Sequence, residues 1–183
     1  MVLDCGVCTV REWRVGDEEP LVRHANNREI WRNLRDQFPH PYTRADAEEW
    51  IAIARRQSPP SSFAIEADGE PVGGIGLKLR DDVERVSAEI GYWLGESLWN
   101  RGIMTAAVRA VTEHGFAQFS LTRVFAVPLL SNTASHRVLE KAGYVREGVL
   151  RRSAIKDGQV LDQVLFAITD VDLARRTAGA PHD

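Results

Sequence analysis

Six consecutive residues at the start of an expected helix have the types and the order of an anion-binding site. They follow a strand-like stretch and a short loop, and they are Asn100, Arg101, Gly102, Ile103, Met104 and Thr105. The first backbone N–H groups of a helix have no partners within it and lie at the positive end of its dipole. Gly102 would let a bulky anion approach these groups, and Arg101 adds a positive charge. The pattern indicates a phosphate or pyrophosphate site, although a glycine that only eases a tight turn would give the same spacing.

A second pair of polar residues opens another expected helix. Asn132 and Ser135 lie at its start, and Gly143 follows its end, where glycine commonly terminates a helix. A serine hydroxyl in a cleft can donate a proton to a leaving group. The same residue types also cap helices by accepting hydrogen bonds from free backbone N–H groups. The residues alone leave both roles open.

The two cysteines of the chain, Cys5 and Cys8, form a C-x-x-C motif. A redox motif of this kind opens a helix whose N-terminus lowers the thiolate pKa, whereas strand-like residues 9–13 follow here. A zinc site needs two further ligands, and no second C-x-x-C or H-x-x-x-H motif follows. We therefore expect no metal site and assign residues 1–8 to an N-terminal arm. A redox or zinc protein is the weakest of the alternative functions.

The spacing of apolar residues predicts one mixed domain, residues 1–183. Thr43 and Asp46 resemble a capping box, and a helix with one apolar side follows them and ends before Ser58. The other expected helices are 17–27, 30–34, 101–119 and 132–142. Apolar residues at a period of two predict the strands 9–13, 62–67, 72–79, 86–94, 123–127, 144–150 and 160–168. This order predicts an α/β (α+β) fold with helices around a mostly antiparallel sheet, and a flexible tail at residues 175–183.

The composition limits the classes of partner. Of the residues, 44% are hydrophobic and 27% are charged, which is typical of a globular protein and excludes a disordered one. The net charge of −3 lacks the basic surplus that nucleic-acid binding needs, so we expect no nucleic-acid partner. No apolar run is long enough to span a membrane, and the N-terminus does not resemble a signal sequence. We therefore expect a cytoplasmic protein without a membrane partner.

Several blocks, in order, resemble one known family. They are Val10 to Trp13, Pro39 to Tyr42, Glu89 to Leu94, Asn100 to Thr105, and Asn132 with Ser135 followed by residues 138–144 and 147–148. The sequence is similar to the GNAT superfamily of acyl-CoA-dependent N-acyltransferases, in particular to the branch with the ribosomal-protein N-terminal acetyltransferases. The resemblance covers nearly the whole chain. It implies the GNAT fold, in which strands four and five splay apart.

The resemblance also implies where acetyl-CoA, the expected cosubstrate, binds. The pantetheine arm would lie in the gap between the splayed strands and meet backbone groups of Trp93 and Leu94. Residues 100–105 would hold the pyrophosphate, and Asn132 would contact the cofactor. No metal is implied.

The same resemblance suggests catalytic and acceptor-binding residues. Ser135 would protonate the leaving thiolate, and Glu89 is the candidate general base, although a carboxylate on a strand can simply face solvent. Trp31, Phe38, Tyr42, Arg151 and Arg152 would line the acceptor cleft. The acceptor is a primary amine, on a protein N-terminus or a small molecule, and a homodimer is the assembly that relatives suggest. The alternative function is a non-catalytic acyl-CoA-binding module on the same fold.

Overall fold

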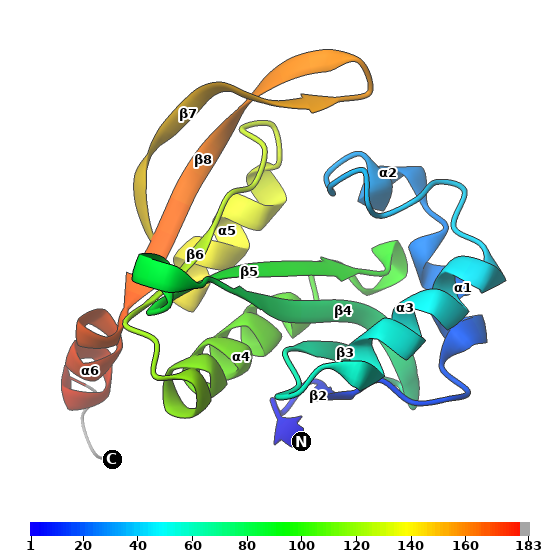
Figure 1. The fold of residues 1–183 in the computed structure, drawn as a ribbon, viewed down its shortest axis with the longest axis horizontal. Coiled ribbons are helices and arrows are strands. Elements are labelled where there is room, and N and C mark those ends of the chain that lie inside the picture. The colour runs from blue at the N-terminus through cyan, green and yellow to red at the C-terminus, as the bar shows by residue number, and fades with distance from the viewer. Residues whose placement is uncertain (180–183) are drawn as a thin grey trace.

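The computed structural model describes residues 1–179, which form one sheet of eight strands with helices on both faces (Figure 1). The strands are β1 (Val2–Asp4), β2 (Thr9–Glu12), β3 (Ser62–Ala67), β4 (Glu70–Leu79), β5 (Ser87–Leu94), β6 (Arg123–Ala126), β7 (Val145–Lys156) and β8 (Gln159–Thr169). The helices are α1 (Glu18–Ala25), α2 (Arg28–Trp31), α3 (Arg44–Arg56), α4 (Ile103–Phe119), α5 (Thr133–Ala142) and α6 (Asp170–Gly179). The sheet order is β1-β2-β3-β4-β5-β6-β8-β7.

All neighbouring strands are antiparallel except β5 and β6, which are parallel. The predicted α/β fold with a mixed, mostly antiparallel sheet is therefore confirmed. Two cores cover the two faces, because neighbouring side chains on a strand point to opposite sides. Ala64 packs with α1 and α3 on one face, while Phe63 and Ile65 pack with α4 on the other.

The expected gap in the sheet lies between β5 and β6. β5 pairs with β4 from Ala88 to Leu94, but it pairs with β6 only at residues 87–89. Beyond this point β6 ends and the chain turns towards α5. The edge of β5 from Ile90 to Leu94 is therefore open, as the resemblance implied.

Local signals account for two of the helix ends. The side chain of Thr43 accepts a hydrogen bond from the Asp46 N–H, and the Asp46 carboxylate accepts one from the Thr43 N–H, so the predicted capping box is present. Gly143 follows α5 with a φ of 98°, a left-handed conformation that glycine adopts without strain.

Both ends of the chain differ from the expectation. The expected N-terminal arm, residues 1–8, is part of the sheet, because β1 pairs with β2 and Cys8 is buried. Gly6, with a φ of 76°, lies in the turn that folds β1 back onto β2. At the other end, α6 continues to Gly179, so residues 175–179 of the expected tail are helical, and the rest of the tail lies outside the described residues.

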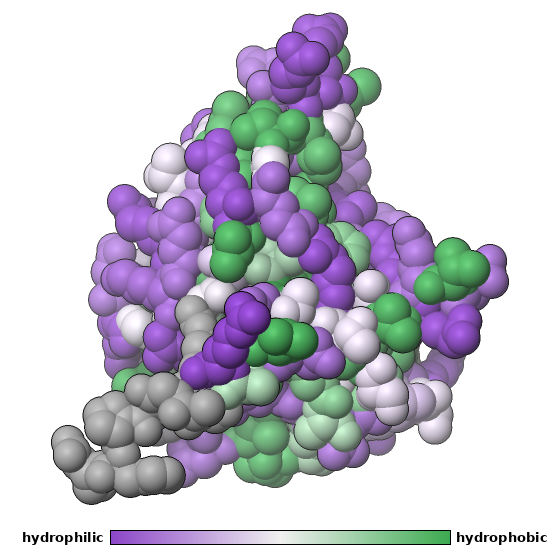
Figure 2. Space-filling view, turned by 90° about the vertical axis from the view of Figure 1, so that its left-hand side faces the viewer, coloured by the Kyte–Doolittle hydropathy of each residue, from purple (hydrophilic) through white to green (hydrophobic). Residues whose placement is uncertain are grey.

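The last hairpin is longer than predicted and forms one side of the molecule. β7 reaches Lys156, and in Figure 1 the hairpin tip points towards α2. Figure 2 shows this side, where hydrophobic side chains are interspersed with hydrophilic ones; Val145, Val149 and Leu150 of β7 are among the exposed apolar residues. No helix in residues 1–179 is long and apolar enough to cross a membrane.

Candidate active site

A cleft of about 1470 Å³ follows the open edge of β5. It is lined by residues around and after α2, one side of α3, β4 and β5, the start of α4 with the loop before it, and the start of α5. The two sequence blocks that suggested an anion site and a proton donor thus meet in one cavity. Arg137 and Lys141 of α5 also line it and add positive charge that the sequence reading missed.

The hydrogen bonds at the two ends of β5 show which backbone groups face the opening. Gly95 N–H donates to the Val72 oxygen of the strand next to it, whereas the Val86 oxygen accepts from Thr122 on the side of β6. Because backbone groups alternate in direction along a strand, odd-numbered residues of β5 bond to β4. The backbone N–H and C=O groups of the even-numbered residues therefore face the open edge.

This alternation changes one of the two expected backbone contacts. The groups facing the gap belong to Tyr92 and Leu94, and those of Trp93 face β4. The Leu94 oxygen already accepts from the Trp99 indole N–H at 2.8 Å, which leaves the Leu94 N–H on that edge. The Trp93 side chain lies on the face of the sheet that α1 and α3 cover, where its ring packs edge-on against Phe38 at a centroid distance of 5.6 Å.

The loop before α4 has the conformation of an anion cradle. Asn100 and Gly102 have left-handed φ angles of 62° and 79°, and no side chain caps the helix. The first helical bond runs from the Ala106 N–H to the Gly102 oxygen, so the N–H groups of residues 103–105 have no partner within the helix. Ile103 and Met104 bury their side chains in the core and can offer only these N–H groups.

Arg101 makes a contact that the sequence did not indicate. Its guanidinium pairs with Asp68 in the turn between β3 and β4, at 3.0 Å. The hydrogen bond from Arg101 lowers the pKa of Asp68 below its usual value. Both side chains are largely exposed, so the pair is weak and Arg101 can exchange Asp68 for a phosphate.

At α5, the two polar residues take different roles. The Asn132 side-chain oxygen accepts from the Ser135 N–H at 3.1 Å, so Asn132 is the helix cap. The Ser135 hydroxyl does not take part in capping. It lies 2.7 Å from the hydroxyl of Tyr92 on β5.

Tyr92 is a site residue that the sequence reading missed. Burial raises the pKa of Tyr92 above its usual value, and the bond to Ser135 offsets this only in part. The tyrosine thus keeps its proton and can donate it to Ser135. Its position among the even-numbered residues of β5, with Ile90 and Leu94 in the core beneath α4, was the signal that could have pointed to it.

Glu89 lies on the opposite face of the sheet from Tyr92. Its side chain is only 12% exposed and pairs with Arg35, from the segment after α2, and with Arg80 at 3.4 Å. Two residues further along the same face, a Cβ on Gly91 would meet no atom within 4 Å. The two arginines therefore fix the Glu89 carboxylate in position beside open space, and Glu89 is not a solvent-facing strand residue.

The expected acceptor residues divide between the cleft and its surroundings. Tyr42 and Phe38 line the cleft, with their rings 4.9 Å apart. Trp31 does not line it. Its ring lies under the ammonium group of Lys156 at 3.8 Å, and Lys156 also pairs with Asp36 at 2.8 Å. Trp31 and Asp36 thus hold the hairpin tip against α2 and the segment after it, because the hairpin is long enough to reach them.

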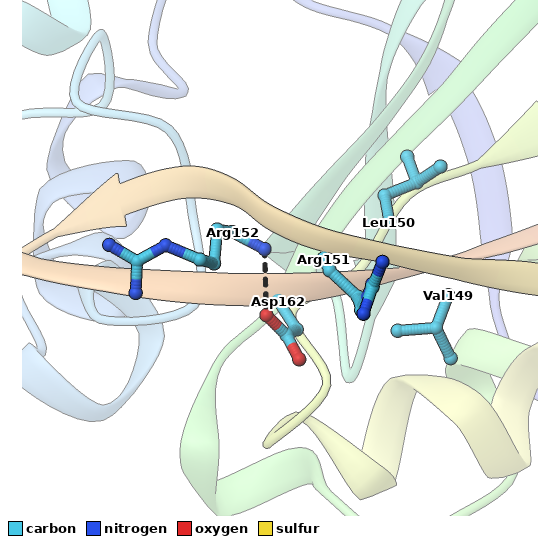
Figure 3. Close-up of a pocket in the computed structure, with 5 residues that line it drawn as sticks. All are labelled: Val149, Leu150, Arg151, Arg152 and Asp162. Carbon is cyan, nitrogen blue, oxygen red and sulfur yellow. Dashed lines mark hydrogen bonds between the residues drawn. The ribbon is translucent and has the colours of Figure 1, made fainter.

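Arg151 and Arg152 line a second cavity, of about 790 Å³, and not the cleft (Figure 3). The pairing of β7 with β8 shifts between Leu150 and Ala154, which leaves extra residues in a bulge. The Arg152 N–H donates to Asp162 at 2.7 Å, and Figure 3 shows the two arginine side chains pointing apart. This bulge turns Arg151 away from the expected position. Within residues 1–179, no group of three or more His, Cys, Asp or Glu residues could hold a metal ion.

An open strand edge beside an uncapped helix start is the arrangement expected of an acyl-CoA-dependent transferase. The family model for the Acetyltransferase (GNAT) domain matches residues 8–145. The chain therefore belongs to the GNAT family, as its sequence blocks indicated. It is an N-acetyltransferase, and its cosubstrate is acetyl-CoA.

Individual proteins agree with this family. The chain is 40% identical over 177 residues to the Probable N-acetyltransferase YjcK of Bacillus subtilis, which covers 89% of this chain and 94% of YjcK. It is 31% identical over 106 residues to the Ribosomal-protein-serine acetyltransferase of Escherichia coli, covering 57% and 58% of the two chains. The structure of Mycobacterium smegmatis RimJ in complex with CoA-disulfide matches with a TM-score of 0.79 and 29% identity, over 92% of this chain and 85% of that one.

Proposed function

We propose that this protein acetylates the α-amine of a protein N-terminus by direct attack of the amine on acetyl-CoA in a ternary complex. The observation that carries the proposal is the arrangement around the open edge of β5. Glu89 lies on one face of the sheet, and the Tyr92–Ser135 pair lies on the other. A thioester in the gap would have a base on the side of the amine and an acid on the side of the sulfur.

The first half of the reaction uses the face of Glu89. The carboxylate takes a proton from the ammonium form of the acceptor, directly or through a water molecule. Arg35 is 66% exposed, so an arriving amine can displace it from Glu89 at small cost. The free amine then forms a C–N bond with the thioester carbon, and the carbonyl oxygen becomes an oxyanion. The N–H groups of Tyr92 and Leu94 point to this gap and can stabilise it.

The second half uses the opposite face. The C–S bond breaks while the nitrogen releases its second proton to water, and the amide and the thiolate of coenzyme A separate. Ser135 gives its hydroxyl proton to the thiolate, Tyr92 gives its own to Ser135, and water returns a proton to Tyr92. The tyrosine suits this role because burial keeps it protonated.

The choice of a protein N-terminus rests on similarity and on the shape of the cleft. One relative is named for acetylating a ribosomal protein. Gly91 lines the same cleft as the residues around and after α2, and a Cβ on it would meet no atom within 4 Å, which would leave room for an extended peptide behind its amine. A small-molecule amine is the competing acceptor.

The test uses acetyl-CoA with peptides that begin with alanine or serine, the same peptides with a formyl-blocked N-terminus, and a panel of small amines. Mass spectrometry locates the acetyl group, and chromatography measures released coenzyme A. Acetylation of free peptides but not of blocked ones supports the proposal. Reaction with small amines alone would overturn the choice of acceptor, and binding of acetyl-CoA without any turnover would favour the non-catalytic acyl-CoA-binding module.

A variant tests the role of Glu89 as the base. Glu89→Gln keeps the shape and should lower kcat/KM by about 10²-fold, the usual contribution of a positioned base, while acetyl-CoA affinity stays unchanged. Glu49→Gln is the matched control, since Glu49 lines the same cleft from α3. An equal loss in both variants would show a general effect of charge and not a base at Glu89.

A further inference from the structure

The turn between β1 and β2 brings the two cysteines face to face. The register pairs Leu3 with Val10 and Asp4 with Thr9, so the next pair along the ladder is Cys5 and Cys8. The Cys5 N–H donates to the Cys8 oxygen at 2.9 Å, which confirms that these two residues oppose each other. The sequence expectation considered only a C-x-x-C motif at a helix start, and the hairpin is a different way to join two thiols.

Their geometry suits a disulfide. Opposed residues of an antiparallel ladder have Cα atoms about 4.5–5.5 Å apart and side chains on the same face. Disulfides join Cα atoms that are about 4.4–6.8 Å apart. The chain has no other cysteine that could compete.

The two thiols differ as an attacking and a resolving cysteine differ. Cys5 is half-buried, whereas Cys8 is 6% exposed and sits in the core. The neighbouring Cys8 thiol lowers the pKa of Cys5, whereas Cys5 and burial raise the pKa of Cys8. The accessible thiol is thus the better nucleophile, and the buried thiol is held beside it.

Cys8 also touches the helix start that faces the cleft. Its thiol donates to the backbone oxygen of Ile103 at 3.8 Å. Ile103 is the first residue of α4, its side chain is fully buried, and its N–H is one of the groups that face the anion cradle. The Ile103 oxygen belongs to the peptide unit that carries the Met104 N–H, another group that faces the cradle, and loss of the Cys8 S–H would remove a hydrogen bond from this unit.

We propose that Cys5 and Cys8 form a reversible disulfide that weakens acetyl-CoA binding through Ile103. The oxidant is a hydroperoxide. The Cys5 thiolate attacks one peroxide oxygen, the O–O bond breaks, and Cys5 becomes a sulfenic acid as the first water or alcohol leaves. Cys8 then attacks the sulfenic sulfur, the S–S bond forms, and the hydroxyl group leaves as water with the proton of Cys8. Two thiols are oxidised and one peroxide is reduced.

The test measures the covalent state and the binding of acetyl-CoA separately. Reduced protein is treated with one equivalent of hydrogen peroxide, and intact mass, thiol titration and peptide mapping follow the product. We expect the loss of two hydrogen masses, the loss of both thiols, and a peptide that links Cys5 to Cys8. Calorimetry should then show acetyl-CoA affinity reduced by about two- to tenfold, the effect of one lost hydrogen bond, and dithiothreitol should restore it.

Variants separate the disulfide from other oxidation. Cys5→Ser leaves Cys8 in place and should keep its acetyl-CoA affinity in peroxide. In Cys8→Ser, Cys5 should stop at a sulfenic acid that dimedone traps. The double variant Cys5→Ser/Cys8→Ser retains Met104 near the cradle, so an equal loss of affinity there, not reversed by dithiothreitol, would overturn the proposal in favour of methionine oxidation. Wild-type protein that shows no linked peptide, or a linked peptide with unchanged acetyl-CoA affinity, would overturn it as well.

Discussion

The hydroxyl of Tyr92 lies 2.7 Å from the hydroxyl of Ser135, and this contact joins β5 to α5 across the gap in the sheet. The serine is free for this contact because Asn132, and not Ser135, caps α5. The sequence left two roles open for this stretch, helix capping and proton donation, and the structure gives the first to Asn132 and leaves Ser135 available for the second. A substitution can therefore remove either role without the other.

Ser135→Ala should affect the reaction and not the fold. A proton donor to the thiolate acts in the transition state, so we expect kcat to fall by about 10²-fold while acetyl-CoA affinity stays within about threefold. Steady-state kinetics measure kcat, and calorimetry measures the acetyl-CoA affinity. Asn132→Ala is the matched variant, since loss of the cap should lower the free energy of unfolding by about 1 kcal/mol. If Ser135→Ala has normal kcat and a lower melting temperature, Ser135 is structural.

Tyr92→Phe should lower kcat without changing the shape of the pH profile. Burial raises the pKa of Tyr92 above its usual value. A raised pKa keeps the phenol neutral through the range below about pH 10. The apparent pKa values of kcat/KM between pH 6 and about pH 9 should therefore be the same in the variant, with a lower plateau. An alkaline limb that disappears in Tyr92→Phe would mean that Tyr92 titrates within this pH range before the reaction starts, against a raised pKa.

Gly102→Asp should weaken acetyl-CoA binding at least about tenfold, or 1.4 kcal/mol, because it adds a carboxylate where the pyrophosphate is expected. Calorimetry measures the affinity, and circular dichroism should be unchanged. Gly102→Ala has the same backbone strain at φ 79° without the charge. Gly158→Asp adds the charge at another left-handed glycine with open space, in the β7–β8 turn. Only Gly102→Asp should lose most of the affinity; equal binding in this variant and wild type would end the assignment of the loop.

The sequence predicted most of the fold because the signals were local. Thr43 with Asp46 marked the start of α3, Gly143 marked the end of α5, and a period of two marked the central strands. The strand β1 was missed because it has three residues and depends on the turn at Gly6 for its pairing. No periodicity can show so short a strand.

The site residues that were misplaced depend on long-range relations. Whether the backbone groups of Tyr92 or those of Trp93 face the gap depends on which edge of β5 bonds to β4. The alternation of side chains between the two faces of the sheet does not reveal this edge. Arg151 does not line the cleft, because extra residues shift the register of β7. Trp31 does not line it either, because the hairpin extends as far as Lys156, which packs on the Trp31 ring. In each case the neighbour that decides the position is distant in the sequence.

Asp36→Asn should raise KM for the acceptor and leave acetyl-CoA affinity unchanged. Asp36 pairs with Lys156, whose side chain is 5% exposed and lies on Trp31, so the hairpin tip is fastened to one wall of the cleft. Weakening this contact lets the wall move, and an increase of about threefold to fivefold in KM would match the loss of a partly exposed ion pair. Glu48→Gln breaks the exposed Arg44–Glu48 pair on α3 and serves as the control. An unchanged KM in Asp36→Asn would show that this contact does not shape the acceptor site.

Gly91→Val should block the acceptor without disturbing the cosubstrate. A side chain at this position would project from the face of β5 that carries Glu89 and would meet no neighbouring atom within 4 Å, so the fold should tolerate it. The backbone groups that face the gap belong to even-numbered residues and would remain in place. We therefore expect acetyl-CoA affinity and melting temperature close to wild type, and kcat/KM for a peptide lowered by an order of magnitude or more, because a misplaced amine loses the orientation that direct attack needs. Gly91→Ala, which adds one methyl group, should have a kcat/KM between those of wild type and Gly91→Val. If Gly91→Val instead loses acetyl-CoA binding and keeps its kcat/KM at saturating cosubstrate, the acceptor does not approach over this face, and Glu89 is not its base.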